Sequence, residues 1–134
     1  MIYSRFENNG KAFDVYVEII DSVFVKGKLN DVNMISFTGK VKGKYFNGEV
    51  MGSGVDTQFI PKNAPALLSA RYMLIGTDID GKKCHCFIEN NGSFEEGFFP
   101  KIVTDSPALS AYEGAELKAE VVPKDNEVII SIYG

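Results

Sequence analysis

The chain has 134 residues, 45% hydrophobic and 24% charged, which is the size and composition of one globular domain spanning residues 1–134. Its net charge of −4 argues against a nucleic-acid partner, because phosphate binding needs an excess of Lys and Arg. The opening residues MIYSRFENNGK lack the pattern of a secretory signal, and no apolar run is long enough to cross a bilayer. We therefore expect a cytoplasmic protein without a membrane partner.

Alternating apolar and polar residues, typical of half-buried β-strands, recur along most of the chain. The first such stretch alternates Phe13, Val15, Val17 and Ile19 with polar or amphipathic neighbours. Stretches that alternate, or that are rich in β-branched and aromatic residues, follow at 35–41, 45–51, 67–75, 84–89, 98–103, 115–121 and 128–133. Short polar turns lie at 8–10, 78–81, 90–92 and 124–126. The pattern predicts an all-β protein of roughly ten short strands.

One short helix is predicted near residues 106–113. Ser106 is suited to cap it, Pro107 fits its first turn, and Gly114 is suited to end it. No other segment of the sequence combines such signals. We therefore expect at most this one helix.

The many short strands favour a closed antiparallel β-barrel, because closure removes the unpaired edges of an open sheet. The stretch 67–75 differs from the others because both of its faces carry apolar residues. A strand of this kind needs cover on both sides. A subunit interface is one way to supply the outer cover, so we expect a homo-oligomer, most simply a dimer.

Several motifs in order resemble one known family. The segment FTGKVKGKYFNGEVMGSGVD at 37–56 is followed by ARY at 70–72, TDIDG at 77–81, NNG at 90–92 and Tyr133. This series resembles the small bacterial and fungal proteins of domain-of-unknown-function family 3237. Two departures are Thr57, where the family usually has Trp, and a strand about two residues longer at KKCHC. The resemblance implies a closed antiparallel barrel and leaves the function open, because the family is uncharacterised.

The stretch KKCHCF at 82–87 holds both cysteines and the only histidine of the chain. In a strand, Cys84 and Cys86 point to one face and His85 to the other, so the three cannot converge on a metal. The two thiols on one strand face are also too far apart for a disulfide. We interpret the cysteines as core residues, and expect no metal and no cofactor.

The Gly-rich segment 48–54 has the composition of a phosphate-binding loop but not its context. Such a loop leads into a helix N-terminus, whereas this one leads to Asp56 and the strand-like residues 57–60. A tight turn is the favoured interpretation.

Asp56 and Arg71 are the strongest candidates for a functional site. Arg71 lies in a stretch that is apolar on both faces, where a guanidinium needs a partner, and Asp56 is the nearest acid before it. The pair is either a structural ion pair or a clamp for an anion or carbonyl group, with Asp56 as a possible catalytic base. Tyr72 and Asn90 are second-rank ligand-binding candidates.

Three functions remain open from the sequence. The first is a β-barrel that binds a small, partly apolar molecule at its mouth or interior. The second is a cofactor-free enzyme of the isomerase, cyclase or lyase kind that uses Asp56 and Arg71. The third is a structural oligomerisation module without a ligand. Neither the ligand nor turnover follows from the sequence.

Overall fold

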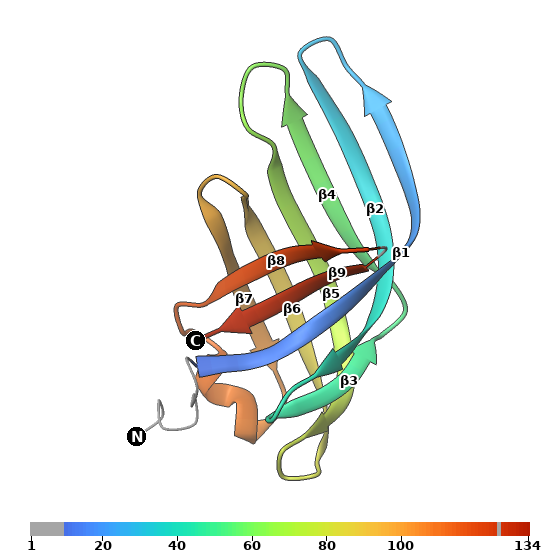
Figure 1. Ribbon diagram of the computed structural model, residues 1–134. Helices are drawn as coiled ribbons and strands as arrows, with labels where there is room; N and C mark the ends of the chain where they lie inside the picture. The colour runs from blue at the N-terminus through green and yellow to red at the C-terminus, as the bar shows by residue number, and fades with distance from the viewer. Residues whose placement is uncertain (1–9, 126) are drawn as a thin grey trace.

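The computed structural model describes residues 10–125 and 127–134, and it consists almost entirely of strands (Figure 1). The expected turn at 8–10 therefore lies mostly outside the described residues, as does Asn126. Within these residues, nine strands and one short 3-10 helix follow each other: β1 (Lys11–Lys26), β2 (Asn30–Lys42), β3 (Phe46–Val50), β4 (Gly54–Pro61), β5 (Leu67–Asp78), β6 (Lys83–Ser93), β7 (Gly97–Thr104), η2 (Pro107–Tyr112), β8 (Lys118–Lys124) and β9 (Glu127–Tyr133).

The nine strands form one antiparallel sheet whose ends meet. The strand order is β1-β9-β8-β7-β6-β5-β3-β2-β4, and the additional pairings β1–β2 and β5–β4 make a ring of eight strands in which β3 and β4 share one position. The predicted all-β antiparallel architecture is confirmed, with nine strands where roughly ten were expected. The weakest joint is between β7 and β8, which share the single pair Phe98↔Ala119.

The short helix forms where the sequence predicted it. The Ser106 hydroxyl accepts a hydrogen bond from the Leu109 backbone nitrogen at 3.3 Å, and Pro107 occupies the first turn. Gly114 follows with a φ of 82°, a conformation that glycine adopts without steric cost. The helix is of the 3-10 type throughout. It is the one helix that the capping signals in the sequence predicted.

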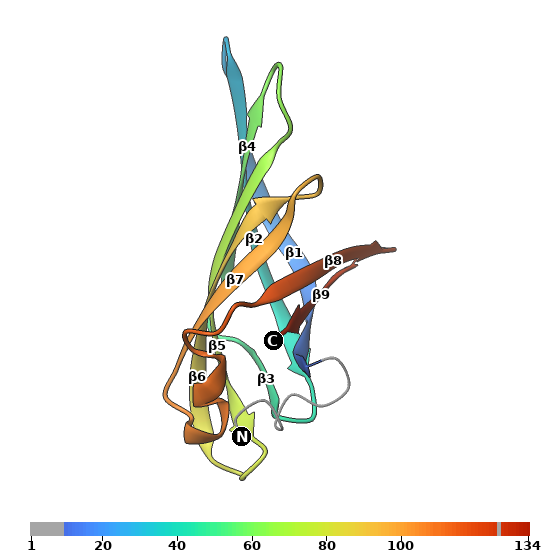
Figure 2. The same ribbon diagram turned by 90° about the vertical axis from the view of Figure 1, so that its left-hand side faces the viewer.

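One part of the sheet extends beyond the rest of the ring, and we call it the blade (Figures 1 and 2). It is thin and consists of parts of β1, β2 and β4 together with the start of β5. This extension was not predicted for β1, because its alternation breaks at a bulge between Ile19 and Asp21. Beyond the bulge Val23, Phe24 and Val25 remain about 60% exposed. The blade therefore leaves large apolar side chains uncovered by the described chain.

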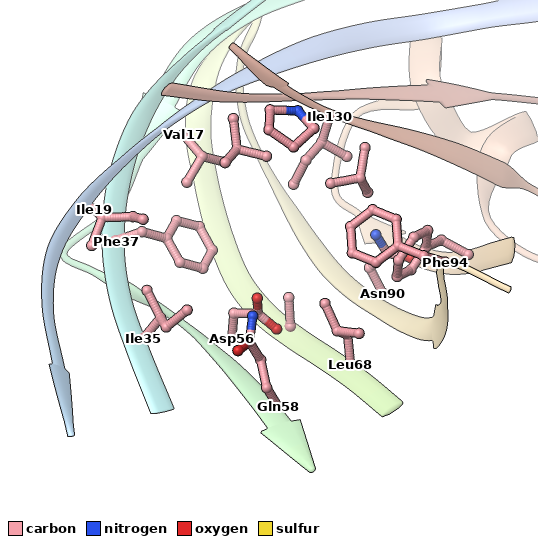
Figure 3. Close-up of a pocket in the computed structure, with 15 residues that line it drawn as sticks. Val17, Ile19, Ile35, Phe37, Asp56, Gln58, Leu68, Asn90, Phe94 and Ile130 are labelled. Carbon is pink, nitrogen blue, oxygen red and sulfur yellow. The ribbon is translucent and has the colours of Figure 1, made fainter. Parts of the chain in front are cut away.

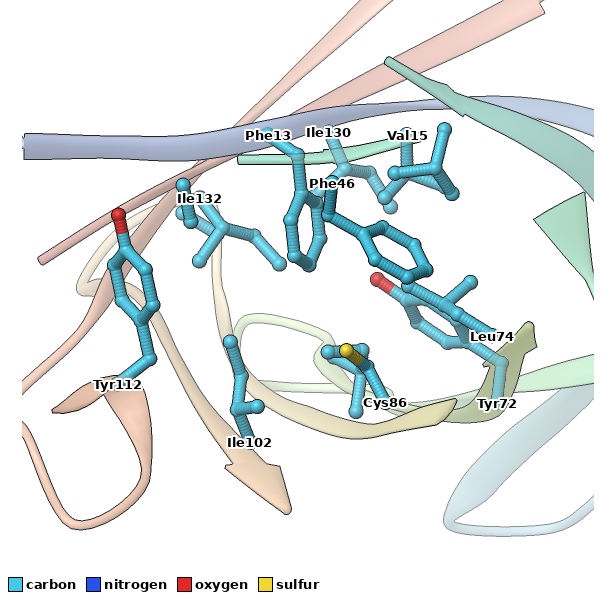
Figure 4. Packing of buried hydrophobic residues seen from close by; sticks show 14 of the residues in the cluster. Phe13, Val15, Phe46, Tyr72, Leu74, Cys86, Ile102, Tyr112, Ile130 and Ile132 are labelled. Atoms are coloured by element: carbon cyan, nitrogen blue, oxygen red, sulfur yellow. The ribbon is translucent and has the colours of Figure 1, made fainter. Parts of the chain in front are cut away.

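The core fills the ring below the blade (Figure 4). Phe13 of β1 and Phe46 of β3 pack with ring centroids 5.6 Å apart, surrounded by Val15, Leu74 and Ile132. Along β5, the inward side chains pass from Leu74 and Tyr72 in the core to Ala70 and Leu68 at a pocket. No helix in the described residues is long and apolar enough to cross a membrane.

Candidate functional site

An apolar pocket of about 240 Å³ opens inside the ring on the side of the blade (Figure 3). Its walls come from strands that are far apart in the sequence, because closure of the ring brings β1 and β2 together with β4, β5, β6 and the β8–β9 hairpin around one interior. Twelve of the fifteen lining residues are apolar: Val17, Ile19, Ile35, Phe37, Leu68, Ala70, Phe94, Phe98, Val121, Pro123, Val128 and Ile130. The other three are Asp56, Gln58 and Asn90.

Asp56, Ala70 and Asn90 form a row across three neighbouring strands. Asp56 of β4 pairs with Ala70 of β5, and Ala70 pairs with Asn90 of β6. Directly opposite residues of antiparallel strands project from the same face of the sheet, here into the pocket. Ala70 also lines the pocket with a small side chain, and we call the part of the pocket over Ala70, between the two polar side chains, the notch.

Both polar ends of this row have an oxygen without a partner. The Oδ1 atoms of Asp56 and Asn90 are buried and accept no hydrogen bond within the described chain. Asn90 is only 4% exposed. Burial raises the pKa of Asp56, and a hydrogen bond with the Gln58 side chain only partly opposes this effect. A buried polar group without a partner costs about 1–3 kcal/mol of stability, so each atom needs an explanation.

Tyr72, the third predicted binding residue, lies in the core next to the pocket. It is 3% exposed, and its ring meets Phe37 edge-on with centroids 5.3 Å apart. Its hydroxyl is buried without a partner among the residues of 10–125 and 127–134, and burial raises the pKa of Tyr72. Tyr72 supports the pocket wall through Phe37 and does not line the pocket itself.

Arg71 lies on the opposite face of the sheet from Asp56, so the expected Asp56–Arg71 pair is wrong. Arg71 Nε lies 2.8 Å from Glu89 Oε2, and 68% of the Arg71 side chain is exposed. The reason is the strand period of two: Ala70 and Tyr72 point inward, so Arg71 between them points outward. The predicted clamp for an anion therefore does not form.

In the KKCHCF stretch, which lies in β6 from Lys83 onward, the cysteine and histidine side chains point to opposite faces, as predicted. Cys84 and Cys86 are free and buried, whereas His85 is exposed and its Nδ1 lies 2.8 Å from Asp105 Oδ2. Burial raises the pKa of the Cys86 thiol to about 12, which suppresses the reactive thiolate. Among the residues that the structure describes, no three His, Cys, Asp or Glu side chains are placed to hold a metal.

The Gly-rich segment 48–54 contains a tight turn, as predicted: its first residues end β3, residues 51–53 form the turn, and Gly54 begins β4. Gly52 has a φ of 68°, and Gly48 pairs with Gly76 of β5. A Cβ atom built on Gly48 would lie 2.2 Å from the Ile75 carbonyl oxygen. These glycines allow close strand packing, and the turn leads into a strand.

Gln58 and the β8–β9 hairpin were not predicted to belong to the site. Gln58 follows Asp56 by two residues on β4, so the strand period places both on one face. That signal was available in the sequence. The contribution of Val121, Pro123 and Val128 was not, because it depends on which strands meet across the ring.

Comparisons with known proteins find similar folds but establish no function for this chain. No family model matches the chain, so the resemblance to family 3237 stays a prediction. A UPF0311 protein of Clostridium acetobutylicum is 40% identical over 55 residues, 41% of this chain and 32% of that protein. The match thus spans about a third of that relative's length.

Solved structures resemble the chain over nearly its whole length. A protein of unknown function from Clostridium acetobutylicum has a TM-score of 0.77 at 22% identity, covering 92% of this chain and 95% of its own. A beta-barrel-like protein from Acinetobacter baumannii has a TM-score of 0.68 at 17% identity, covering 92% of both chains. An enzyme from Penicillium herquei has a TM-score of 0.73 at 12% identity, again covering 92% of both. At these identities the similarity concerns the fold alone.

Proposed function

We propose that the ring is a closed β-barrel that binds a small, partly apolar molecule in the pocket beside Asp56 and Asn90. One observation carries the proposal: an apolar pocket contains two buried oxygen atoms that accept no hydrogen bond from any described residue. Ligand sites typically combine apolar walls with a few convergent polar groups. A bound molecule that hydrogen-bonds these atoms would offset the cost of burying them. We place this activity in the cytoplasm, where the buried thiols stay reduced.

The size of the pocket limits the ligand. An apolar cavity of roughly 150 Å³ holds one benzene ring. A cavity of about 240 Å³ therefore suits a compact molecule of one or two fused rings.

Native mass spectrometry of the purified protein, followed by thermal-shift screening of small cyclic metabolites, tests the proposal. We expect a ligand that raises the unfolding temperature of the wild type and not of Ala70→Leu, whose larger side chain fills the notch. The matched control is Ala64→Leu, which adds the same three carbon atoms at an exposed position in the turn before β5. Equal stabilisation of all three proteins would contradict binding at this pocket.

A second candidate function is catalysis without a cofactor, of the isomerase, cyclase or lyase kind. Asp56 is the only titratable residue among the described residues that line the pocket, and burial raises its pKa. A carboxyl group tuned in this way is suited to exchange a proton with a bound substrate. Arg71 has no part in this scheme, because it lies on the outer face. Solvent deuterium incorporation into a bound ligand, lost in Asp56→Asn, would distinguish catalysis from binding.

We also propose that two copies associate through the blade. Its outer face carries an apolar row across four strands, in which Val25 pairs with Val32, Val32 with Phe59, and Phe59 with Leu67. Val25, Phe59 and Leu67 are 59%, 42% and 57% exposed. Within the described chain β9 pairs with β1 only as far as Glu18, so the β1 edge beyond it is open for a second copy.

Light scattering after size-exclusion chromatography tests this association. We expect a dimer at tens of micromolar that Phe59→Lys converts to a monomer. Val103→Lys is the matched control, because Val103 is 55% exposed on β7, away from the blade. A wild-type protein that remains a monomer would rule out the dimer.

A further inference from the structure

We infer that the pocket selects an uncharged ring compound that carries a hydroxyl group and places this hydroxyl over Ala70, between Asp56 and Asn90. The inference rests on the proposed binding function and adds the chemical class of the ligand. It follows from the row that these three residues form across β4, β5 and β6.

The free polar atoms at the row determine what a ligand must supply. Asp56 Oδ1 and Asn90 Oδ1 are both hydrogen-bond acceptors, and both are buried without a donor in the part of the chain that the structure describes. A ligand carbonyl or ether oxygen has no proton to donate, so it would place a third acceptor oxygen against these two. A hydroxyl group donates its proton to one of these acceptors. Because it can also accept a hydrogen bond, it remains a suitable partner if the Asn90 amide presents its nitrogen or if Asp56 is protonated.

The charge around the pocket disfavours an anion. No Lys, Arg or His occurs among the described residues that line it, and Arg71 points outward to Glu89. A ligand carboxylate would lose its hydration in apolar surroundings and lie next to the Asp56 carboxyl group without a compensating cation. Fatty acids and aromatic acids are therefore disfavoured as ligands. A cation would lose its hydration as well, and burial raises the pKa of Asp56 and so favours the neutral carboxyl group, which supplies no counter-charge.

The walls favour a flat ring. Phe37, Phe94 and Phe98 line the pocket, and Phe94 meets Phe98 edge-on with centroids 5.1 Å apart. Phe94 lies at the rim and is 65% exposed, whereas Phe98 is 6% exposed. An aromatic or alicyclic ring that packs against these side chains removes the Phe94 face from water and places its hydroxyl deeper, at the row.

Four probes with one ring system test the inference by fluorescence titration and calorimetry. 2-Naphthol carries the hydroxyl, 2-methylnaphthalene lacks it, 2-naphthoate carries a negative charge, and 2-(aminomethyl)naphthalene a positive charge. We expect 2-naphthol to bind at least about ten-fold more tightly than each of the others, the gain typical of one recovered hydrogen bond.

Variants test whether the preference for the hydroxyl group depends on Asp56 and Asn90. We expect Asp56→Leu with Asn90→Leu to bind 2-naphthol and 2-methylnaphthalene equally, because only the hydroxyl partners are removed. Glu89→Leu, next to Asn90 and facing outward, should keep the ten-fold preference. Circular dichroism of each variant verifies the fold, and Asp56→Asn provides a second variant if the double Leu protein unfolds: it should reduce the preference several-fold.

The outcomes separate the inference from the proposed function. Equal binding of 2-naphthol and 2-methylnaphthalene by the wild type overturns the ligand class and leaves the binding function in place. Tightest binding of the naphthoate or the amine overturns the class in favour of an anion or a cation. Failure of all four probes to bind at millimolar concentration overturns the class and counts against the proposed pocket function as well.

Discussion

Replacing Ala70 with Leu should stabilise the protein while abolishing ligand binding. The substitution adds three carbon atoms to a side chain that projects into a cavity of about 240 Å³. Each buried methylene contributes about 0.8 kcal/mol, which gives an upper limit of about 2.4 kcal/mol. Covering the unpartnered oxygens of Asp56 and Asn90 more deeply offsets part of this gain. We expect a net stabilisation of about 1–2 kcal/mol.

The expected change in melting temperature follows from the size of the chain. An unfolding entropy of about 2.1 cal/mol/K per residue, applied to 134 residues, gives about 3.5 °C per kcal/mol. Differential scanning calorimetry should therefore find Ala70→Leu about 4–7 °C above the wild type, and Ala64→Leu within about 1 °C of it. A lower melting temperature for Ala70→Leu would mean that the notch is too small for these atoms, and the pocket argument would fail.

Three further outcomes are expected. Burial raises the pKa of Asp56, so the stability linked to its protonated form is complete below the ordinary aspartate pKa and is lost as the pH rises through the raised value. Urea unfolding should show that the stability of Asp56→Asn increases relative to that of the wild type over this pH range. A stability difference that does not depend on pH would refute the pKa shift. Arg71→Met breaks an exposed ion pair with Glu89, so it should cost under about 1 kcal/mol and leave probe binding unchanged; a lost ligand would return Arg71 to the site. Cys84 and Cys86 should resist a thiol reagent in the native protein at about pH 8, and both should react after unfolding; rapid native labelling would show that the core opens.

Local alternation along the chain accounts for most of what could be predicted of the fold. Phe13, Val15 and Val17 repeat with period two and do point into the core. The same rule failed beyond Ile19, where a bulge shifts the period and lets β1 continue to Lys26. A bulge inserts one residue without a clear sequence signal, so alternation alone ends the strand too early.

The site was predicted in part, and the error has a specific physical cause. Asp56 was singled out as the partner of Arg71, and Asn90 was a second-rank candidate in the expected turn at 90–92. The structure places both in the pocket, with Asn90 inside β6 and not in a turn. Arg71 was paired with Asp56 because the strand was thought to be covered on both faces. Its outer face is in fact open in the single chain, so an exposed guanidinium there is not costly. Which face of a strand lines the interior depends on partners across the ring.

The ring also affects how the chain folds, because its closure joins segments that are far apart in the sequence. Lys11 of β1 pairs with Tyr133 of β9, and the Gly134 backbone nitrogen donates to the Gly10 carbonyl oxygen at 2.8 Å. The β1 segment is synthesised more than 100 residues before β9, so the edge of β1 that pairs with β9 has no native partner until β9 is made. Pairing over such a separation makes folding slow and leaves a strand edge open to aggregation during synthesis. Refolding should thus end with β9 docking onto β1, and substitutions in β9 should slow this last step more than substitutions in the β5–β6 hairpin.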